Sequence, residues 1–227
     1  MNPLRRHQLA RLSEAGWATV LARPWDRQAR ECLAHWARHG LPLVVTTQPL
    51  DAAASGSVAL GLPAPARWDR RRLALLVPRA GLRRVDEFPR LAEVQDLLPP
   101  AVQYRVLKLM AELDACHATA RVFGSYGWQA MSDLDHVRPE SDLDLSVVVH
   151  GAAHADAVAQ ALQSFDAARP RLDGELLFND GAAVAWREWI EWRSGRAHAV
   201  LVKRLHGVAL HRDTAWCEHA KQAEPLA

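Results

Sequence analysis

Two stretches decide the fold: Val122-Phe-Gly-Ser-Tyr-Gly127 and, after a connection, Ser141-Asp-Leu-Asp-Leu-Ser-Val-Val-Val149. The first is typical of an apolar strand that runs into a Gly-Ser turn, and the second of an apolar strand opened by two aspartates. Successive side chains of a strand point to opposite faces, so Asp142 and Asp144 share a face about 7 Å apart. Two carboxylates on one rigid edge, beside a turn suited to phosphate, predict a site for a divalent metal ion and for phosphoryl transfer.

The Gly124-Ser125 turn predicts where phosphate binds. It places backbone N–H groups and the Ser125 hydroxyl at the start of a short helix over 126–131, which is a ready anion site for a triphosphate. We expect Asp142 and Asp144 to hold Mg²⁺ there, since this ion favours carboxylate, water and phosphate oxygens. The Asp-x-Asp pattern is common, and alone it would indicate an acidic pair without a metal. The Gly-Ser turn upstream favours the functional interpretation.

The stretch Leu172-Asp-Gly-Glu-Leu176 supplies two candidates for a third carboxylate, which would serve a second metal ion or act as general base. Asp173 and Glu175 stand two apart, so on a strand they share a face. Glu175 adjoins the apolar run 176–178, and we favour it slightly as the third metal ligand and catalytic acid. Asp173, nearer the start of the strand, stays open as the alternative.

A second Asp-Leu-Asp occurs at 133–135 and is the obvious competitor for the metal. It is followed by His136-Val-Arg-Pro139, and no apolar strand holds its carboxylates on a fixed edge. We therefore interpret it as a solvated loop. Two basic residues that follow apolar runs, Lys203 and Arg187, are the candidates for binding phosphate oxygens, Arg as a bidentate donor and Lys as a point charge.

The first 85 residues predict a small α+β domain. Residues 26–39 have the pattern of a helix, with Asp26 as its cap and Gly40 as its end. Short apolar runs bounded by Pro or Gly predict strands. These strands are expected at 43–46, 57–62 and 72–77.

Residues 86–227 predict a second α+β domain, a mixed sheet of about five strands with helices on one side. The Asn179-Asp-Gly181 turn indicates a hairpin, and three tryptophans at helical spacing from Trp186 indicate packing rather than base stacking. Helices are expected at 89–98, 101–116 and 154–168, and strands from 120, at 141–149, 171–178, 182–186, 199–203 and 207–211.

Charge is unevenly distributed along the chain. Residues 1–114 hold 17 Lys and Arg against 11 Asp and Glu, a balance of +6, whereas residues 115–227 hold 11 against 15, a balance of −4. The basic N-terminal domain is the expected docking surface for an acidic partner. No stretch has the apolar length of a membrane span, and the three separated cysteines indicate reduced thiols, so we expect a cytoplasmic protein without membrane or nucleic-acid partners.

The Gly124-Ser125 and Asp142-Leu-Asp144 pair resembles the pattern of the nucleotidyltransferase superfamily. More of the chain resembles one branch, the malonate decarboxylase holo-acyl-carrier-protein synthases, or phosphoribosyl-dephospho-coenzyme A transferases. The matching pieces span nearly the whole chain. They are Leu41-Pro-Leu-Val-Val45, Ala59-Leu-Gly-Leu-Pro63, Gly124-Ser-Tyr-Gly-Trp-Gln129, Ser141-Asp-Leu-Asp-Leu145, Leu172-Asp-Gly-Glu175, Ala183-Val-Ala-Trp-Arg-Glu188 and Val200-Leu-Val-Lys203.

The resemblance implies a nucleotidyltransferase-like fold and a specific Mg²⁺-dependent reaction. Its substrates would be 2′-(5″-triphosphoribosyl)-3′-dephospho-coenzyme A and the apo acyl carrier protein of malonate decarboxylase. A carrier serine would attack the α-phosphorus and expel pyrophosphate, with Asp142 and Asp144 as metal carboxylates and Gly124-Ser125 as the phosphate turn. Two alternatives remain open: another nucleotidyltransferase acting from ATP on a small molecule, protein or RNA, and a non-catalytic binding module.

Overall fold

The computed structural model describes residues 4–49, 52 and 55–218, which fall into two compact units. The first unit holds the described residues up to Phe88, together with Met131–Val137 and Leu205–Gly207. The second holds Pro89–Ala130, Arg138–Arg204 and the described residues from Val208 onward. Each unit has its own sheet, and eight α-helices occur within the described residues, so the predicted mixture of helices and strands is confirmed.

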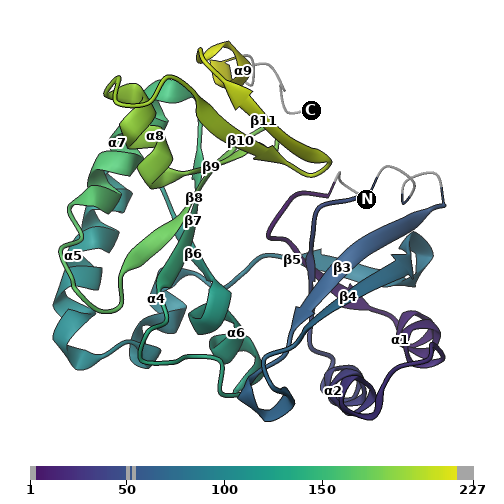
Figure 1. The fold of residues 1–227 in the computed structure, drawn as a ribbon. Helices are drawn as coiled ribbons and strands as arrows, with labels where there is room; N and C mark the ends of the chain where they lie inside the picture. The colour runs from purple at the N-terminus through teal and green to yellow at the C-terminus, as the bar shows by residue number, and fades with distance from the viewer. Residues whose placement is uncertain (1–3, 50–51, 53–54, 219–227) are drawn as a thin grey trace, which may run out of the picture. The chain divides into compact units, whose positions relative to one another are not determined.

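The sheet of the first unit has five antiparallel strands in the order β4-β3-β2-β1-β5 (Figure 1). Buried and exposed side chains alternate along β3 and β4, so one face of the sheet supplies the core. The strands are β1 (Leu9–Leu12), β2 (Leu43–Val45), β3 (Ser57–Pro63), β4 (Arg72–Pro78) and β5 (Leu82–Asp86).

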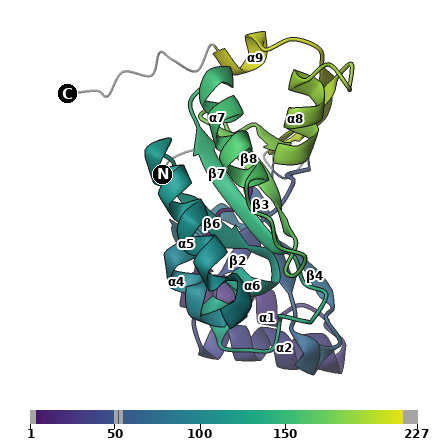
Figure 2. The ribbon, with the colours of Figure 1, turned by 90° about the vertical axis from the view of Figure 1, so that its left-hand side faces the viewer.

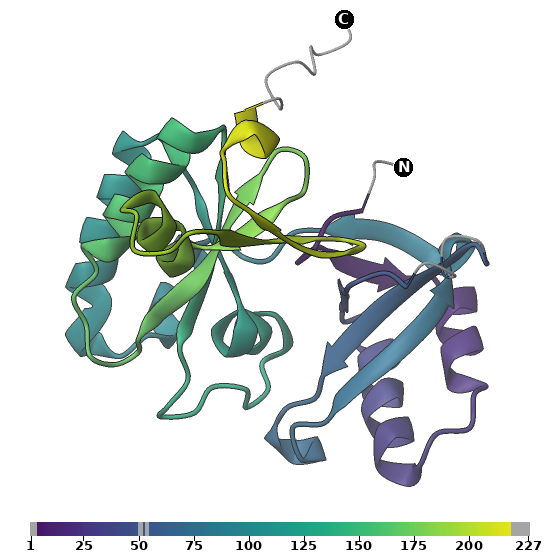
Figure 3. The same cartoon turned by 45° about the horizontal axis from the view of Figure 1, so that its top comes forward.

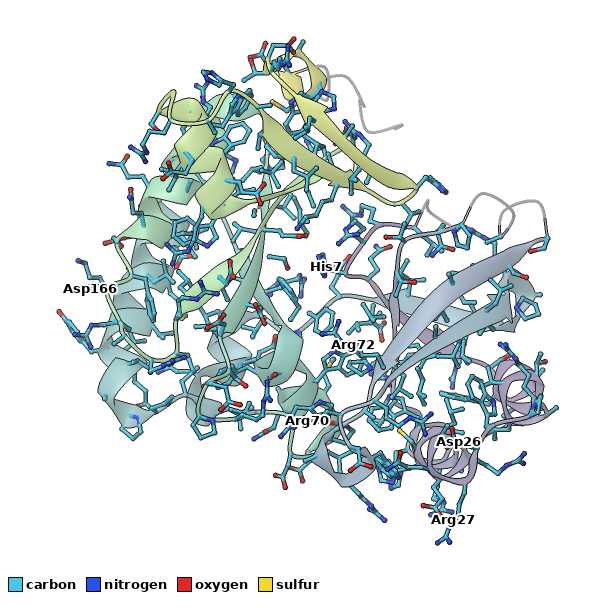
Figure 4. All side chains as sticks on the ribbon, viewed as in Figure 1. His7, Asp26, Arg27, Arg70, Arg72 and Asp166 are labelled. Atoms are coloured by element: carbon cyan, nitrogen blue, oxygen red, sulfur yellow. The ribbon has the colours of Figure 1, made fainter. Side chains whose placement is uncertain are left out.

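Two helices, α1 (Glu14–Leu21) and α2 (Arg27–Arg38), complete the core of the first unit. Figure 4 shows Asp26 at the start of α2, where its carboxylate accepts the backbone N–H of Ala29 at 3.0 Å. Both oxygens of Asp26 also accept from Arg71 at 2.6 Å, which holds the pKa of Asp26 well below its usual range. The predicted helix and three strands of this region are confirmed, whereas β1, α1 and β5 had no clear sequence signal.

The sheet of the second unit has six strands in the order β11-β10-β9-β8-β7-β6, and each overlaps one of the strand ranges expected from the sequence. The pair β7–β8 is parallel, and β6–β7, β8–β9 and β9–β10 are antiparallel. Each strand therefore lies beside its neighbour in the sequence. The strands are β6 (Ala120–Phe123), β7 (Leu143–Val149), β8 (Leu172–Phe178), β9 (Ala183–Ala185), β10 (Val200–Arg204) and β11 (Gly207–His211).

Helices α5 (Pro100–Ala115), α7 (Ala152–Gln163) and α8 (Trp186–Arg193) lie along one face of this sheet, the face turned toward the viewer in Figure 2. Trp186, Trp189 and Trp192 are all buried, which confirms their interpretation as packing residues. The other helices of this unit are α4 (Leu91–Val94), α6 (Gly124–Ser132) and α9 (Ala215–Glu218). Short 3-10 turns occur at Ala66–Trp68 and Arg79–Gly81 in the first unit and at Gln95–Leu97 in the second.

Three expectations for the second unit need correction. The helix expected over 154–168 is α7, which ends at Gln163 and is capped at Ser164. The helix expected over 89–98 is only the short α4 followed by a 3-10 turn, because the chain already turns before Pro99. Trp186 was expected to end a strand, but it begins α8. Among the described helices, none combines the length and apolar character that crossing a membrane requires.

Gly174 allows β8 to approach β7 closely. Its φ is 141°, and a Cβ at this position would lie 1.8 Å from the backbone oxygen of Leu145. Replacing Gly174 by Ala is therefore expected to lower the free energy of unfolding by about 2–3 kcal/mol, because one strand must shift. Gly195→Ala is the matched control, since Gly195 also has a positive φ but open space around the added Cβ. Equal losses in urea denaturation would contradict the steric explanation.

Candidate active site

Four strand ends meet at one edge of the second unit's sheet, whose strands Figure 3 shows from above. Strands β6 and β9 end there, and β7 and β8 begin there, because β7 and β8 are parallel to each other and antiparallel to the outer two. In this register Phe123 lies beside Asp144, and Asp144 lies beside Asp173. Residues paired in this way point to the same face of a sheet. The edge thus gathers side chains that are far apart in the sequence.

Three carboxylates occupy this edge, and we call Asp142, Asp144 and Asp173 the acidic edge. Asp142 directly precedes β7, so it is not held in the strand as Asp144 is. The leucines that alternate with these acids, Leu143 and Leu172, are buried in the core. The alternation predicted from the sequence therefore places the acids on the face opposite the buried leucines.

The Gly-Ser turn lies directly against Asp144. Gly124 has a φ of 62°, and a Cβ on it would come within 1.9 Å of Oδ2 of Asp144, so no larger residue fits. Gly124 and Ser125 also open α6, whose first N–H groups have no partner within a helix. The structure therefore brings the turn, the helix start and the aspartate together, as the spacing in the sequence predicts.

Asp144 is the electrostatically unusual member of the acidic edge. Burial, and then the charges of Asp173 and Asp142, raise the pKa of Asp144 from 3.8 to about 7, while Arg171 opposes this shift. The protonated form of Asp144 is therefore favoured up to about pH 7, although one protein cation lies nearby.

That cation is Arg171, a residue that no sequence motif singled out. Its Nη2 donates to Oδ2 of Asp142 at 2.6 Å and to Oδ2 of Asp173 at 3.2 Å, and its Nε donates to Asp142 at 3.3 Å. One guanidinium therefore joins acids from two neighbouring strands. The only signal in the sequence was its position, two residues before Asp173 at the entry of a predicted strand.

Asp173 and Glu175 share a face but have different surroundings. Asp173 is paired in register with Asp144, whereas Glu175 is paired with Ser146, two residues farther along the strands. Glu175 is buried, and its carboxylate accepts from Nζ of Lys203 at 2.8 Å. Asp173 thus lies within the acidic edge, and Glu175 lies beside it in an ion pair.

One predicted phosphate-binding cation, Lys203, lies on the same sheet, and the other, Arg187, lies on the helix that follows β9. Lys203 reaches this face through β10, which pairs with β9, and its side chain is 27% exposed. Arg187 is exposed at the start of α8, where its Nη2 donates to the carbonyl of Leu172 at 3.0 Å and its guanidinium stands 4.1 Å from the centre of the Trp186 ring. This contact keeps Arg187 next to the beginning of β8.

The competing Asp-Leu-Asp motif forms a loop, as predicted. Asp133 and Asp135 are exposed and belong to the first unit, whereas the acidic edge belongs to the second. The backbone of this loop is held by hydrogen bonds: Ala66 donates to the carbonyl of Asp135 at 3.1 Å, and Arg70, labelled in Figure 4, donates to the carbonyl of His136 at 2.9 Å. The loop therefore has a structural explanation.

The donors of the acidic edge suit a divalent cation that is completed by phosphate. Among the described residues, no three His, Cys, Asp or Glu side chains form a ready metal cage. Mg²⁺ at phosphoryl-transfer sites is commonly held by one or two carboxylates together with phosphates and waters. Asp142 and Asp144 are oxygen donors of this kind, and burial together with the neighbouring acids raises the pKa of Asp144.

The raised pKa of Asp144 makes a measurable prediction for the metal-free protein. Between about pH 4 and pH 7 the folded protein keeps a proton that the unfolded chain has lost, so stability falls as the pH rises through this window. Asp144→Asn removes the effect, and its Tm should exceed the wild-type Tm by about 5 °C at pH 8 and by much less at pH 4.5. Thermal unfolding in EDTA measures both. The same difference at both pH values would mean that Asp144 ionises normally.

Comparison with known families identifies the class of protein. A family model described as the phosphoribosyl-dephospho-CoA transferase MdcG C-terminal domain matches residues 90–214, and the corresponding N-terminal domain model matches residues 5–88. Both models describe domains of a transferase. The chain belongs to the family of phosphoribosyl-dephospho-CoA transferases, which confirms the resemblance found in the sequence.

Curated relatives lead to the same family. A protein named phosphoribosyl-dephospho-CoA transferase from Bradyrhizobium diazoefficiens is 35% identical over 210 residues, covering 92% of this chain and 90% of the relative. One of the same name from Xanthomonas campestris is 37% identical over 188 residues, covering 82% and 86%. One from Pseudomonas aeruginosa is 32% identical over 172 residues, covering 75% and 78%. No solved structure gave a significant match.

Proposed function

We propose that this protein transfers the phosphoribosyl-dephospho-CoA group from 2′-(5″-triphosphoribosyl)-3′-dephospho-CoA to a serine of an apo acyl carrier protein, the carrier subunit of malonate decarboxylase. The observation that carries the proposal is the contact between Gly124 and Asp144 at the edge where Asp173 also lies. The turn at Gly124 is suited to phosphate and the carboxylate of Asp144 to a cation, and the chain belongs to this transferase family. We infer a nucleotidyltransferase-like fold for the second unit on the same grounds.

In the proposed reaction the carrier serine oxygen forms a bond to the α-phosphorus of the triphosphoribosyl group. The bond from that phosphorus to the oxygen shared with the β-phosphorus breaks, and pyrophosphate leaves with the bond's electrons. The serine proton passes to a carboxylate of the enzyme. The product is a phosphodiester between the carrier and the prosthetic group.

The chain's own residues have separable roles in this proposal. The N–H groups at the start of α6 and the Ser125 hydroxyl bind phosphate oxygens, because a helix N-terminus favours anions. Lys203 and Arg187 supply positive charge for the rest of the phosphate chain. These groups hold the α-phosphorus near the acidic edge, and holding reactants in place is a large part of catalysis in phosphoryl transfer.

Asp142 and Asp144 are the residues that would hold Mg²⁺. The ion would neutralise the phosphates and the leaving pyrophosphate. Asp144 is fixed for this role by β7 and by its contact with Gly124, whereas Asp142 precedes the strand and can adjust to the ion.

For the third carboxylate we propose Asp173, the alternative that the sequence left open. Its register beside Asp144 supports the choice, as does its large influence on the pKa of Asp144. Glu175, slightly favoured from the sequence, has Lys203 on its carboxylate and influences Asp144 less. We propose that Asp173 takes the serine proton and that Glu175 orients Lys203.

The basic first unit is the proposed docking surface for the carrier, since acyl carrier proteins are generally acidic and the N-terminal half carries a balance of +6. We also propose a cytoplasmic location. Cys32, Cys116 and Cys217 are free thiols, and burial raises the pKa of Cys32 to about 12 and that of Cys217 to about 11, so these two react poorly.

Mass spectrometry of carrier proteins tests the proposed function. Incubation of the apo carrier subunit with the enzyme, Mg²⁺ and the triphosphoribosyl precursor should add one phosphoribosyl-dephospho-CoA group to one serine and release pyrophosphate. A carrier whose serine is replaced by Ala should gain no mass. An unmodified wild-type carrier, together with labelling of a small molecule or RNA from ATP, would favour a different nucleotidyltransferase. The absence of any transfer would favour a binding module.

A further inference from the structure

Arg171 links two strands at the acidic edge through their carboxylates. Its own backbone is fixed, because its carbonyl accepts the N–H of Leu143 at 2.9 Å, so the side chain always starts beside Asp142. From there it reaches Asp142 at 2.6 Å and Asp173 at 3.2 Å. Both of these acids also raise the pKa of Asp144. Arg171 therefore occupies carboxylate oxygens that a divalent cation would need.

The contacts of Arg171 are easily broken. The side chain is 55% exposed, and ion pairs in water contribute little because solvent competes for both charges. A divalent cation carries twice the charge of a guanidinium and would compete for the same oxygens. The single guanidinium faces two of the three carboxylates of the acidic edge, Asp142 and Asp173.

We propose that Arg171 is a placeholder: it holds the acidic edge together without substrate, yields Asp142 to the divalent cation, and then binds the phosphate chain that the cation brings. This inference rests on the proposed function. An arginine fork suits phosphate oxygens as well as carboxylates, so both partners use the same donors. In this proposal, the guanidinium of Arg171 becomes a bidentate donor to the substrate phosphates only after the cation has bound.

Binding measurements with defined probes test the proposal. Mn²⁺ is titrated by electron paramagnetic resonance without substrate, and magnesium triphosphate is titrated by calorimetry. Arg171→Gln should bind Mn²⁺ about fivefold more tightly, because a competitor for Asp142 is gone. The same variant should bind magnesium triphosphate about tenfold or more weakly, because two phosphate donors are lost. Arg171→Lys keeps the charge without the fork and should fall between wild type and Arg171→Gln in both titrations.

Arg169→Gln is the matched control, since it makes the same charge change two residues away. Arg169 is exposed and takes part in no ion pair with any residue that the structure describes. The Arg169→Gln variant should bind both probes as the wild type does. Asp144→Asn should lose Mn²⁺ binding.

The placeholder role would be overturned if Arg171→Gln bound Mn²⁺ no more tightly than wild type, or if it bound magnesium triphosphate as well as wild type does. If wild type still modifies the carrier in either case, only the role of Arg171 is lost and the proposed function stands. If neither wild type nor Arg171→Gln binds Mn²⁺, the placeholder role is also wrong. The mass gain on the carrier then decides the proposed function separately.

Discussion

Asp144→Asn is expected to lower the rate of transfer to the carrier by about a thousandfold or more, with the fold retained. The carboxylate stands at the meeting point of β7, the Gly124 turn and Asp173, so its charge cannot be replaced by a neighbour. Asn has nearly the same shape but lacks the negative charge that a cation needs. The rate is measured as pyrophosphate release and as mass gain on the carrier, with circular dichroism to check the fold.

The second Asp-Leu-Asp motif supplies a matched control for this prediction. Asp135→Asn makes the same chemical change in an exposed loop of the first unit, and transfer should continue at the wild-type rate. A folded Asp144→Asn protein that modifies the carrier normally would exclude Asp144 from the reaction. Loss of transfer in both variants would place the effect outside the acidic edge.

The second large effect concerns stability. Lys203→Met should lower the free energy of unfolding by about 3–5 kcal/mol, because it leaves the charge of a buried glutamate without the ammonium that faces it. The carboxylate of Glu175 is only 9% exposed and accepts from Lys203 at 2.8 Å. Glu175→Gln should cost less, because the Lys203 side chain is 27% exposed and its ammonium can turn to water. Urea denaturation at pH 7 measures both variants.

Two further variants isolate the pair itself. The double variant Glu175→Gln with Lys203→Met should be more stable than Lys203→Met alone, since no charge is left buried. Arg204→Met changes the next residue of β10, which pairs with Asp180 at the surface, and should cost less than about 1 kcal/mol. Equal losses for Lys203→Met and Arg204→Met, or simple additivity in the double variant, would contradict a coupled buried pair.

Much of the fold could be predicted because its signals are local. The strands around Val122 and Leu145 alternate or run apolar between turn residues, and the structure places both in the sheet of the second unit. The first strand and helix of the chain could not be predicted in the same way. β1 is only four residues long and includes Arg11, and α1 contains Gly16, which is rare inside helices.

Gly16 is explained by a tertiary contact that the local sequence pattern does not contain. A Cβ on Gly16 would come within 2.4 Å of the backbone oxygen of Gly81, so α1 can approach this turn only with glycine there. The local sequence pattern predicts that Gly16 disfavours a helix, because the pattern contains no information about Gly81, which lies 65 positions away. Close backbone approach outweighs helix propensity at this position.

In the candidate site, too, local motifs indicate some contacts, whereas others depend on the tertiary structure. The contact of Gly124 with Asp144 follows from two short motifs and one spacing, so the sequence could indicate it. The ion pairs of Glu175 with Lys203 and of Arg171 with Asp142 join residues 28 and 29 positions apart, and they depend on strand register. Register across four strands is set by packing of the whole sheet, which no single motif encodes.

The strand order of the second unit also implies an order of assembly during translation. Because β6 to β11 lie side by side in the sequence order, the sheet can grow by one strand at a time as the chain leaves the ribosome. The aspartates and Glu175 are synthesised before β10. A nascent chain that stops before Lys203 therefore lacks the ammonium that faces Glu175 in the complete sheet, and synthesis of β10 supplies it.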